Sequence, residues 1–163
     1  MKHTIAILVE NEFGALARIA GLFSGRGYNI ESLTVAPTLD ATLSRMTINT
    51  VGSDHVVEQV IKQLNKLVNV VKVKDVSGDE PISCNLALIK INLNKRNQKK
   101  IKALIRPFDA RVIMADDKCS VLRVVADDKE LSQLTARLTP YGIMEYISTG
   151  SVAMQRGKKV IKA

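Results

Sequence analysis

Residue types that could support catalysis or metal binding are few in this sequence. The two histidines, His3 and His55, have no Cys, Asp or Glu near them at the spacing that metal ligands show. We therefore interpret both as surface or capping residues. The two cysteines, Cys84 and Cys119, stand alone in strand-like runs, which favours buried thiols in a reducing compartment. These residues predict no metal site and no catalytic thiol.

Other signatures of enzymatic chemistry are missing as well. The carboxylate pairs Asp116–Asp117 and Asp127–Asp128 fall in predicted turns, where solvated turn residues are a better interpretation than an acid–base pair. Gly21, Gly25 and Gly27 lie late in a predicted helix or just after it, whereas a dinucleotide-binding loop precedes its helix. No Walker loop and no Ser-His-Asp pattern stands out. We predict no catalytic site, and an enzyme acting alone is the least supported hypothesis.

The most suggestive feature is a turn that leads from a strand into a helix. The strand ends at Glu10, the turn contains Gly14, and the helix begins directly afterwards. Open amides at a helix start bind anions such as carboxylates, and glycine lets a ligand approach the backbone closely. Asn11 can cap the helix or hydrogen-bond a ligand, while Glu10 and Glu12 would attract an ammonium group. The turn favours either simple capping or a zwitterion such as an amino acid.

Alternating and helical patterns surround this turn in the first half of the chain. Apolar residues at helical spacing, Leu16, Ile19, Ala20 and Phe23, predict a helix over residues 15–24. A second helix is predicted over 55–67, and strands over 4–10, 28–37, 43–51 and 69–76. The order is βαββαβ, which is the split-βαβ or ferredoxin-like pattern.

The second half repeats this order after a linker at residues 77–81. Strands are predicted over 82–93, 111–115, 121–126 and 143–152, and helices over 97–108 and 129–138. We therefore predict an α+β protein of two ferredoxin-like domains, 1–77 and 82–163, whose basic tail 156–163 frays. Two helices cover only one face of a four-stranded sheet, so the other face and the edge strands stay available. Because units of this size commonly bury such surface by pairing with another copy, we expect at least a homodimer.

The charge of the chain is distributed unevenly. The formal net charge is +8, but residues 1–80 carry 8 basic and 9 acidic side chains. The basic excess lies in the second half, most densely over residues 95–102, and suggests either a nucleic-acid-binding regulator or a surface for an acidic partner. RNA-binding sheets display aromatic side chains, and the second half has only Phe108, Tyr141 and Tyr146. This favours the acidic partner or a solvated face.

No apolar run of ~18 residues and no leader segment stands out, so we expect a cytoplasmic protein.

A long motif gives the first half a family resemblance. Residues 8–48 closely resemble the start of the regulatory (small) subunits of bacterial acetolactate synthase, also called acetohydroxyacid synthase. The motif residues, in order, are Asn11, Gly14, Leu16, Arg18, Gly21, Leu22, Phe23, Arg26, Gly27, Asn29, Ile30, Ser32 and Leu33. The strong match covers about residues 3–75, and the second half resembles the family in length and element order.

The resemblance implies an ACT domain followed by a domain similar in fold to the C-terminal domain of nickel-responsive regulators. Since no His follows position 55, nickel sensing is discarded. In the family the large catalytic subunit carries thiamine diphosphate, magnesium and FAD, and condenses two pyruvates, or pyruvate with 2-oxobutanoate. The small subunit is implied to bind none of these cofactors. It is implied to activate the catalytic subunit and to make it sensitive to valine or another branched-chain amino acid.

The resemblance also implies an effector site between two ACT domains. From the turn and helix start it implies Asn11, Phe13, Gly14, Ala15 and Leu16, and from the second strand of the partner protomer Asn29 and Ile30. The helix-start amides would take the effector carboxylate, the two asparagines would hold the zwitterion, and Leu16 and Ile30 would line an apolar pocket. Because one methylene in such a pocket is worth only ~1–3 kcal/mol, the ranking of valine, leucine and isoleucine stays open.

Overall fold

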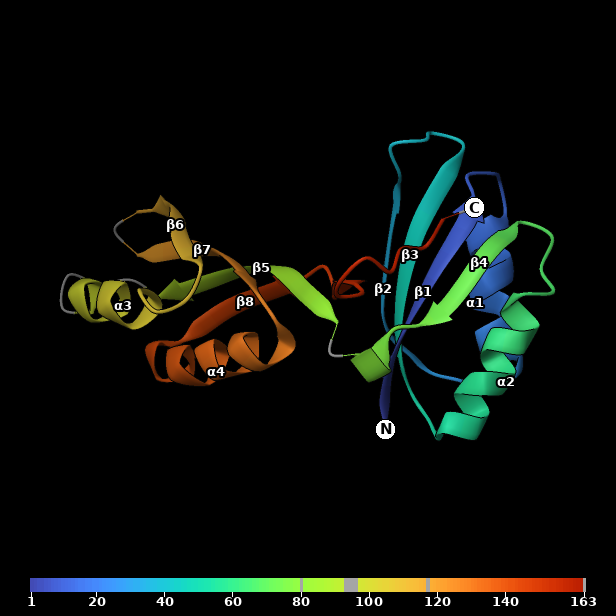
Figure 1. Cartoon of the computed structure of the whole chain (residues 1–163). Helices are drawn as coiled ribbons and strands as arrows, with labels where there is room; N and C mark the ends of the chain where they lie inside the picture. Colours follow the sequence, from blue (N-terminus) through green and yellow to red (C-terminus); the bar gives the residue numbers. More distant parts are fainter. Residues whose placement is uncertain (80, 93–96, 117, 163) are drawn as a thin grey trace. The chain divides into compact units, whose positions relative to one another are not determined.

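The computed structural model describes residues 1–79, 81–92, 97–116 and 118–162 (Figure 1). It divides into two compact units, the first formed by Met1–Ser83 with Val152–Ala163 and the second by Cys84–Ser151. The predicted linker lies near the first of these boundaries, although its residue Glu80 is outside the described residues. The C-terminal boundary differs from our prediction, because the last segment of the predicted domain 82–163 groups with the first unit.

The first unit confirms the predicted βαββαβ order. Its sheet is antiparallel with strand order β2-β3-β1-β4, so β2 and β4 are the edge strands. The elements are β1 (Lys2–Glu10), α1 (Ala15–Gly25), β2 (Ile30–Pro37), β3 (Leu43–Val51), α2 (Asp54–Leu64), β4 (Val70–Asp75) and a short 3-10 turn, η1 (Ser77–Asp79).

Local hydrogen bonds explain where α2 begins and ends. Its first turn is capped by Ser53, whose hydroxyl accepts a hydrogen bond from the Val56 amide at 3.4 Å. We predicted a helix to residue 67, but α2 ends at Leu64. Directly after it, the side-chain amide of Asn65 donates to the Ile61 carbonyl at 2.8 Å. Asparagine competes in this way for backbone groups, and the apolar pattern alone does not reveal it.

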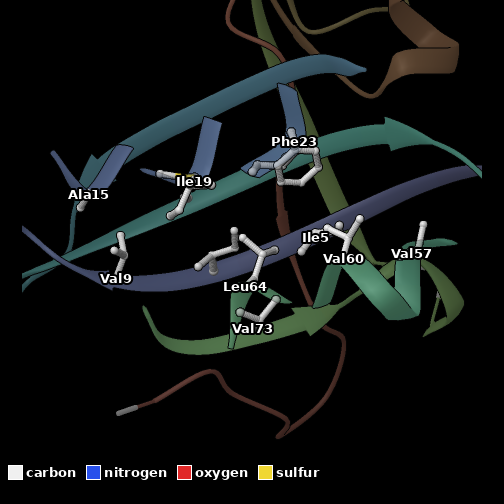
Figure 2. Packing of buried hydrophobic residues seen from close by; sticks show 12 residues of the cluster. Ile5, Val9, Ala15, Ile19, Phe23, Val57, Val60, Leu64 and Val73 are labelled. Carbon is white, nitrogen blue, oxygen red and sulfur yellow. The ribbon is translucent and has the colours of Figure 1, made fainter. Parts of the chain in front are cut away.

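Both helices pack on one face of the first sheet, as Figure 2 shows. Side chains alternate along a strand, so every second residue of β1 and β3 points toward the helices. Phe23 is fully buried at the centre, and its ring meets Tyr28 edge-on with centroids 6.5 Å apart. The buried cluster comprises Ile5, Ile7, Val9, Ala15, Ile19, Phe23, Met46, Ile48, Val57, Val60, Leu64 and Val73.

The second unit has the same element order and its own core, which confirms the predicted fold class. Its sheet has strand order β6-β7-β5-β8, and α4 begins with a capping box in which Asp127 accepts from the Glu130 amide at 2.8 Å. The elements are β5 (Ile82–Asn92), α3 (Gln98–Ile105), β6 (Ala110–Ala115), β7 (Cys119–Ala126), α4 (Asp128–Leu138), η2 (Thr139–Tyr141) and β8 (Ile143–Ser148).

The C-terminal segment departs from both predictions made for it. The predicted strand 143–152 ends at Ser148, a loop with Gly150 at φ 77° follows, and a separate strand β9 (Val152–Met154) pairs with β5. Ala153 and, within the tail that we expected to fray, Ile161 pack with Ala6 and Val76 of the first unit. Ile161, near the end of the chain, is therefore partly buried by residues far away in sequence, which a local pattern does not predict.

Asp116 and the two cysteines have structural rather than catalytic surroundings. The Asp116 carboxylate accepts hydrogen bonds from the amides of Lys118 and Cys119, as expected of a turn residue, while Asp117 lies outside the described residues. Both cysteines are free thiols, but half-buried rather than buried. Burial and the Asp116 carboxylate raise the pKa of the Cys119 thiol, which lowers its reactivity. Within the described residues, no helix is both long and apolar enough to cross a membrane.

Candidate functional site

The turn after β1 leaves the start of α1 without a side-chain cap. Gly14 occupies the N-cap position in the left-handed conformation, with φ 82° and ψ −7°. A Cβ at this position would contact nothing within 4 Å, yet a non-glycine residue would be strained by its backbone angles. In the first turn of a helix the amides, here of Leu16 and Ala17, have no intrahelical acceptor. This helix start can therefore receive an anion.

Asn11 does not cap α1, so that part of our prediction is wrong. Its side-chain amide donates to the Ala41 carbonyl at 3.0 Å, and its backbone amide donates to the Thr42 carbonyl at 2.7 Å. Both acceptors belong to the loop between β2 and β3. Asn11 therefore ties the turn to this loop, and its side-chain oxygen and second amide N–H can still face a ligand.

Asn69, which we did not predict as a site residue, hydrogen-bonds to side chains on both sides of the turn. Its side chain is buried, and its amide nitrogen donates to a carboxylate oxygen of Glu10 at 3.1 Å and of Glu12 at 2.9 Å. Its side-chain oxygen accepts a hydrogen bond from Arg18 of α1. One amide thus joins two carboxylates and a guanidinium around the helix start. No local signal could have identified it, because Asn69 lies 57 residues after Glu12.

Replacing Asn69 with Ala is expected to loosen this turn. Without the amide, two carboxylates and Arg18 lose their shared partner in a partly buried place, so the free energy of unfolding should fall by about 1–3 kcal/mol. Binding of an amino acid at the helix start should weaken as well. Denaturation curves and titration calorimetry measure the two effects. The control is Asn65→Ala, which removes an exposed asparagine whose side chain donates to the Ile61 carbonyl of its own helix. An equal loss in both variants would contradict the assignment.

The predicted site residues of the helix start differ in exposure. Phe13 is fully exposed, and Leu16 is 43% exposed on the first turn of α1. Ala15 instead lies in the buried cluster, and its amide donates to the Glu12 carbonyl at 3.3 Å. Ala15 can therefore contribute backbone shape but no side-chain contact, whereas Phe13 and Leu16 are available to a ligand or a second protomer.

Asn29 and Ile30 do not meet the helix start within one chain. Ile30 of β2 pairs with Thr50 of β3, and Thr50 in turn pairs with His3 at the beginning of β1. The helix start follows the other end of β1, where Glu10 pairs with Leu43. At about 3.3 Å per residue, the seven steps from His3 to Glu10 span roughly 23 Å. The structure therefore brings Asn11, Phe13, Gly14 and Leu16 together and leaves the pair from the second strand at the opposite end of the sheet.

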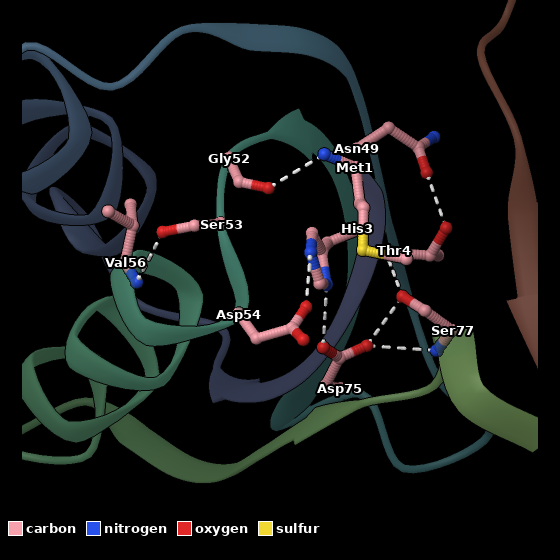
Figure 3. Close-up of polar contacts among 10 residues, drawn as sticks. All are labelled: Met1, His3, Thr4, Asn49, Gly52, Ser53, Asp54, Val56, Asp75 and Ser77. Atoms are coloured by element: carbon pink, nitrogen blue, oxygen red, sulfur yellow. Dashed lines mark hydrogen bonds and ion pairs between the residues drawn. The ribbon is translucent and has the colours of Figure 1, made fainter.

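His3 forms a polar cluster with two aspartates, which our prediction of a surface or capping residue did not anticipate (Figure 3). It lies within β1 and is 6% exposed, with Nδ1 3.0 Å from Asp75 and Nε2 3.4 Å from Asp54 at the start of α2. Ser77 donates its amide and hydroxyl to the other Asp75 oxygen. Among the described residues, no group of three or more His, Cys, Asp or Glu could hold a metal ion. The cluster joins β1, β4 and α2.

Acid should weaken this cluster through Asp75. Burial alone would raise the pKa of Asp75, but hydrogen bonds from Ser77 and His3 outweigh it and lower the pKa. A lowered pKa in the folded state means that Asp75 stabilises the protein above its unfolded pKa near 3.9, and that this stabilisation is lost as the pH falls through the folded value. Asp75→Asn should therefore cost about 1 kcal/mol at pH 7 and less at pH 3, measured by urea unfolding. The exposed change Asp109→Asn is the control; a pH-independent loss in Asp75→Asn would contradict the prediction.

Two family models match the chain in succession. The model described as an AHAS small subunit-like ACT domain matches residues 5–72, and the model described as the small subunit of acetolactate synthase matches residues 85–157. The chain belongs to the acetolactate synthase small-subunit family. The second match ends at Gly157, so this family's C-terminal region runs into the segment that the structure groups with the first unit.

Similar acetolactate synthase small subunits cover nearly the full chain. A probable acetolactate synthase small subunit from Archaeoglobus fulgidus is 46% identical over 159 residues, which is 98% of this chain and 99% of the relative. The isozyme 3 small subunit from Escherichia coli is 39% identical over 163 residues, covering 99% of this chain and 100% of the relative. The crystal structure of the small subunit from Thermotoga maritima matches with a TM-score of 0.89 at 30% identity, over 98% and 99% of the two chains. The family resemblance and the fold are confirmed.

Proposed function

We propose that this chain is the regulatory partner of a large acetolactate synthase subunit in the cytoplasm. It performs no chemistry of its own. It raises the activity of the large subunit, which carries thiamine diphosphate, magnesium and FAD, and it makes that activity sensitive to valine or a related branched-chain amino acid. The observation that carries the effector part is the uncapped start of α1 behind Gly14.

The chemistry of the turn suits a zwitterion. The amides of the first turn and the helix dipole attract a carboxylate. The Glu12 carboxylate, which is exposed, can face an ammonium group while it still accepts from Asn69. The side chain of Leu16, 43% exposed, offers the apolar contact that a branched side chain needs. A near-neutral site with both signs of charge selects an amino acid over a simple anion.

A homodimer through β2 would complete this site. β2 is an edge strand, and Val35 on it is 41% exposed. If two copies of β2 pair antiparallel, the beginning of one strand lies beside the end of the other. The partner's Asn29 and Ile30 then approach the end of the sheet where α1 begins. One protomer supplies the helix start, and the other supplies the amide and the apolar wall.

Regulation follows from linkage. An effector that binds one arrangement of the dimer more tightly shifts the attached large subunit toward its less active state. A coupling free energy of ~1–3 kcal/mol produces a several-fold to hundred-fold change in affinity, so small differences between the two arrangements suffice.

Reconstitution with a large subunit tests this proposal. Acetolactate formation from pyruvate is followed with the large subunit alone, with this chain added, and with valine, leucine and isoleucine titrated separately. We expect activation on mixing and inhibition that saturates with at least one of the amino acids. A mixture that shows neither activation nor a response to any of them would refute the proposal, and turnover by this chain alone would reassign it as an enzyme.

A further inference from the structure

The C-terminal segment, residues 152–162, is anchored on the sheet face of the first unit that the helices leave open. Ile5 and Ile7 of β1 point to the helices, so Ala6 between them points to the other face. Ala6 is nevertheless fully buried, because it packs in a cluster with Val76 and Ala153, against which Ile161 lies. Arg45 adds a hydrogen bond from its guanidinium to the Ala153 carbonyl at 3.3 Å. The segment is thus held at both ends of its length.

This anchored segment is strongly cationic. It carries four basic and no acidic residues. All four basic side chains, Arg156, Lys158, Lys159 and Lys162, are exposed. Anchoring at Ala153 and Ile161 therefore keeps a row of positive charges on one face of the first unit, although the first 80 residues of the chain carry a small negative charge.

The strand beneath adds to the same positive field. Lys74 pairs with Ala6 and Lys72 pairs with Leu8 across the β1–β4 ladder, so both lysines lie on the face that the segment covers. Glu10 lies on the same face by alternation along β1, and its carboxylate accepts a hydrogen bond from Asn69 at the end of the sheet. We call Arg156, Lys158, Lys159, Lys162, Lys72 and Lys74 the cationic face.

We propose that the cationic face docks on an acidic protein surface of the large catalytic subunit. This inference rests on the proposed function and extends it by assigning the docking surface. Complementary charge steers association and sets the register of partners. A segment already anchored in the free chain loses little conformational entropy on docking.

The neighbours of these charges favour a protein over a nucleic acid. Val160 and Met154 of the same segment are 63% and 67% exposed, so apolar contact area stands beside the lysines. The segment contains no aromatic residue on which a base could stack. Mixed apolar and cationic side chains fit the polar rim and apolar centre of a protein interface.

Two triple charge reversals with equal change in net charge test this inference. The first is K158E/K159E/K162E on the cationic face, and the control is K99E/K100E/K102E on the exposed side of α3 in the second unit. Binding of each to the purified large subunit is measured by titration calorimetry in 50 and 200 mM salt, with circular dichroism as a check of folding. We expect the first variant to bind at least about ten-fold more weakly, to lose most of the salt dependence, and to keep its fold, while the control binds like the wild type.

Other outcomes separate this inference from the proposed function. Unchanged binding of K158E/K159E/K162E, or a larger loss in the α3 control, would overturn the docking surface and leave the regulatory role in place. A wild-type chain that does not bind the large subunit would overturn both. Tight, salt-dependent binding of a duplex oligonucleotide near 150 mM salt, abolished by K158E/K159E/K162E, would assign the cationic face to nucleic acid instead. An Ile161→Asp variant, which detaches the anchor but keeps the lysines, should weaken binding in the same direction.

Discussion

Replacing Gly14 with Asp is expected to abolish inhibition by branched-chain amino acids in the complex with the large subunit. The new carboxylate would sit at the N-cap of α1, where it satisfies the first-turn amides itself and repels the carboxylate of an incoming effector. Inhibition should be lost over the amino-acid concentrations that inhibit the wild type, which corresponds to a rise of more than about ten-fold in the concentration for half-inhibition, the equivalent of a lost charge-assisted hydrogen bond. Acetolactate formation at increasing valine, leucine or isoleucine, normalised to the rate of each variant without effector, measures it.

The matched control is Gly14→Asn. Asparagine has nearly the shape of aspartate and tolerates the left-handed backbone at φ 82°, but it carries no charge. We expect Gly14→Asn to shift half-inhibition less than Gly14→Asp. Equal losses in the two variants would show that bulk rather than charge matters at this position, and inhibition retained in Gly14→Asp would show that the effector binds elsewhere.

Replacing Phe23 with Ala should produce the largest loss of stability among single changes in the first unit. Phe23 is fully buried between α1 and the sheet and meets Tyr28 edge-on. Removing a buried phenyl ring costs about 3–5 kcal/mol through lost apolar transfer and the cavity left behind. For a unit of this size the thermal midpoint should fall by roughly 10 °C or more. Calorimetric melting of the whole chain measures the change.

Phe13→Ala serves as the control for that experiment, because Phe13 is the same residue type in full exposure. Its melting temperature should stay close to that of the wild type, since surface substitutions change stability by about 0.5 kcal/mol or less. A small effect of Phe23→Ala would mean that the first-unit core collapses around the missing ring. A large effect of Phe13→Ala would mean that this ring is covered in solution, as a dimer through the first unit would cause.

The order of helices and strands could be predicted because each leaves a periodic pattern in the sequence. α1 follows the apolar spacing from Leu16 to Phe23, and β1 ends at the predicted Glu10. In two places a polar group or a glycine ended an element earlier than predicted. α2 stops before Asn65, whose side chain bonds the helix carbonyl, and β8 stops before the loop with Gly150.

The candidate site could be predicted only where it is local. A strand, a glycine turn and a helix start are adjacent in sequence, so their anion-binding geometry follows from short-range rules. Asn69 approaches from the loop before β4, and His3 gains Asp54 and Asp75 only when β1, β4 and α2 pack together. Such contacts depend on strand register rather than on spacing along the chain.

The family, the twofold βαββαβ order and the helix-start turn are therefore properties of the amino-acid sequence, because periodicity and turn chemistry act over a few residues. Tertiary structure determined which residues far apart in the sequence come into contact. It buried the Asn69 amide among Glu10, Glu12 and Arg18, and it laid the basic C-terminal segment over Ala6 on the open face of the first sheet. The physical reason is that burial of apolar area and pairing of buried polar groups act between residues far apart in the chain.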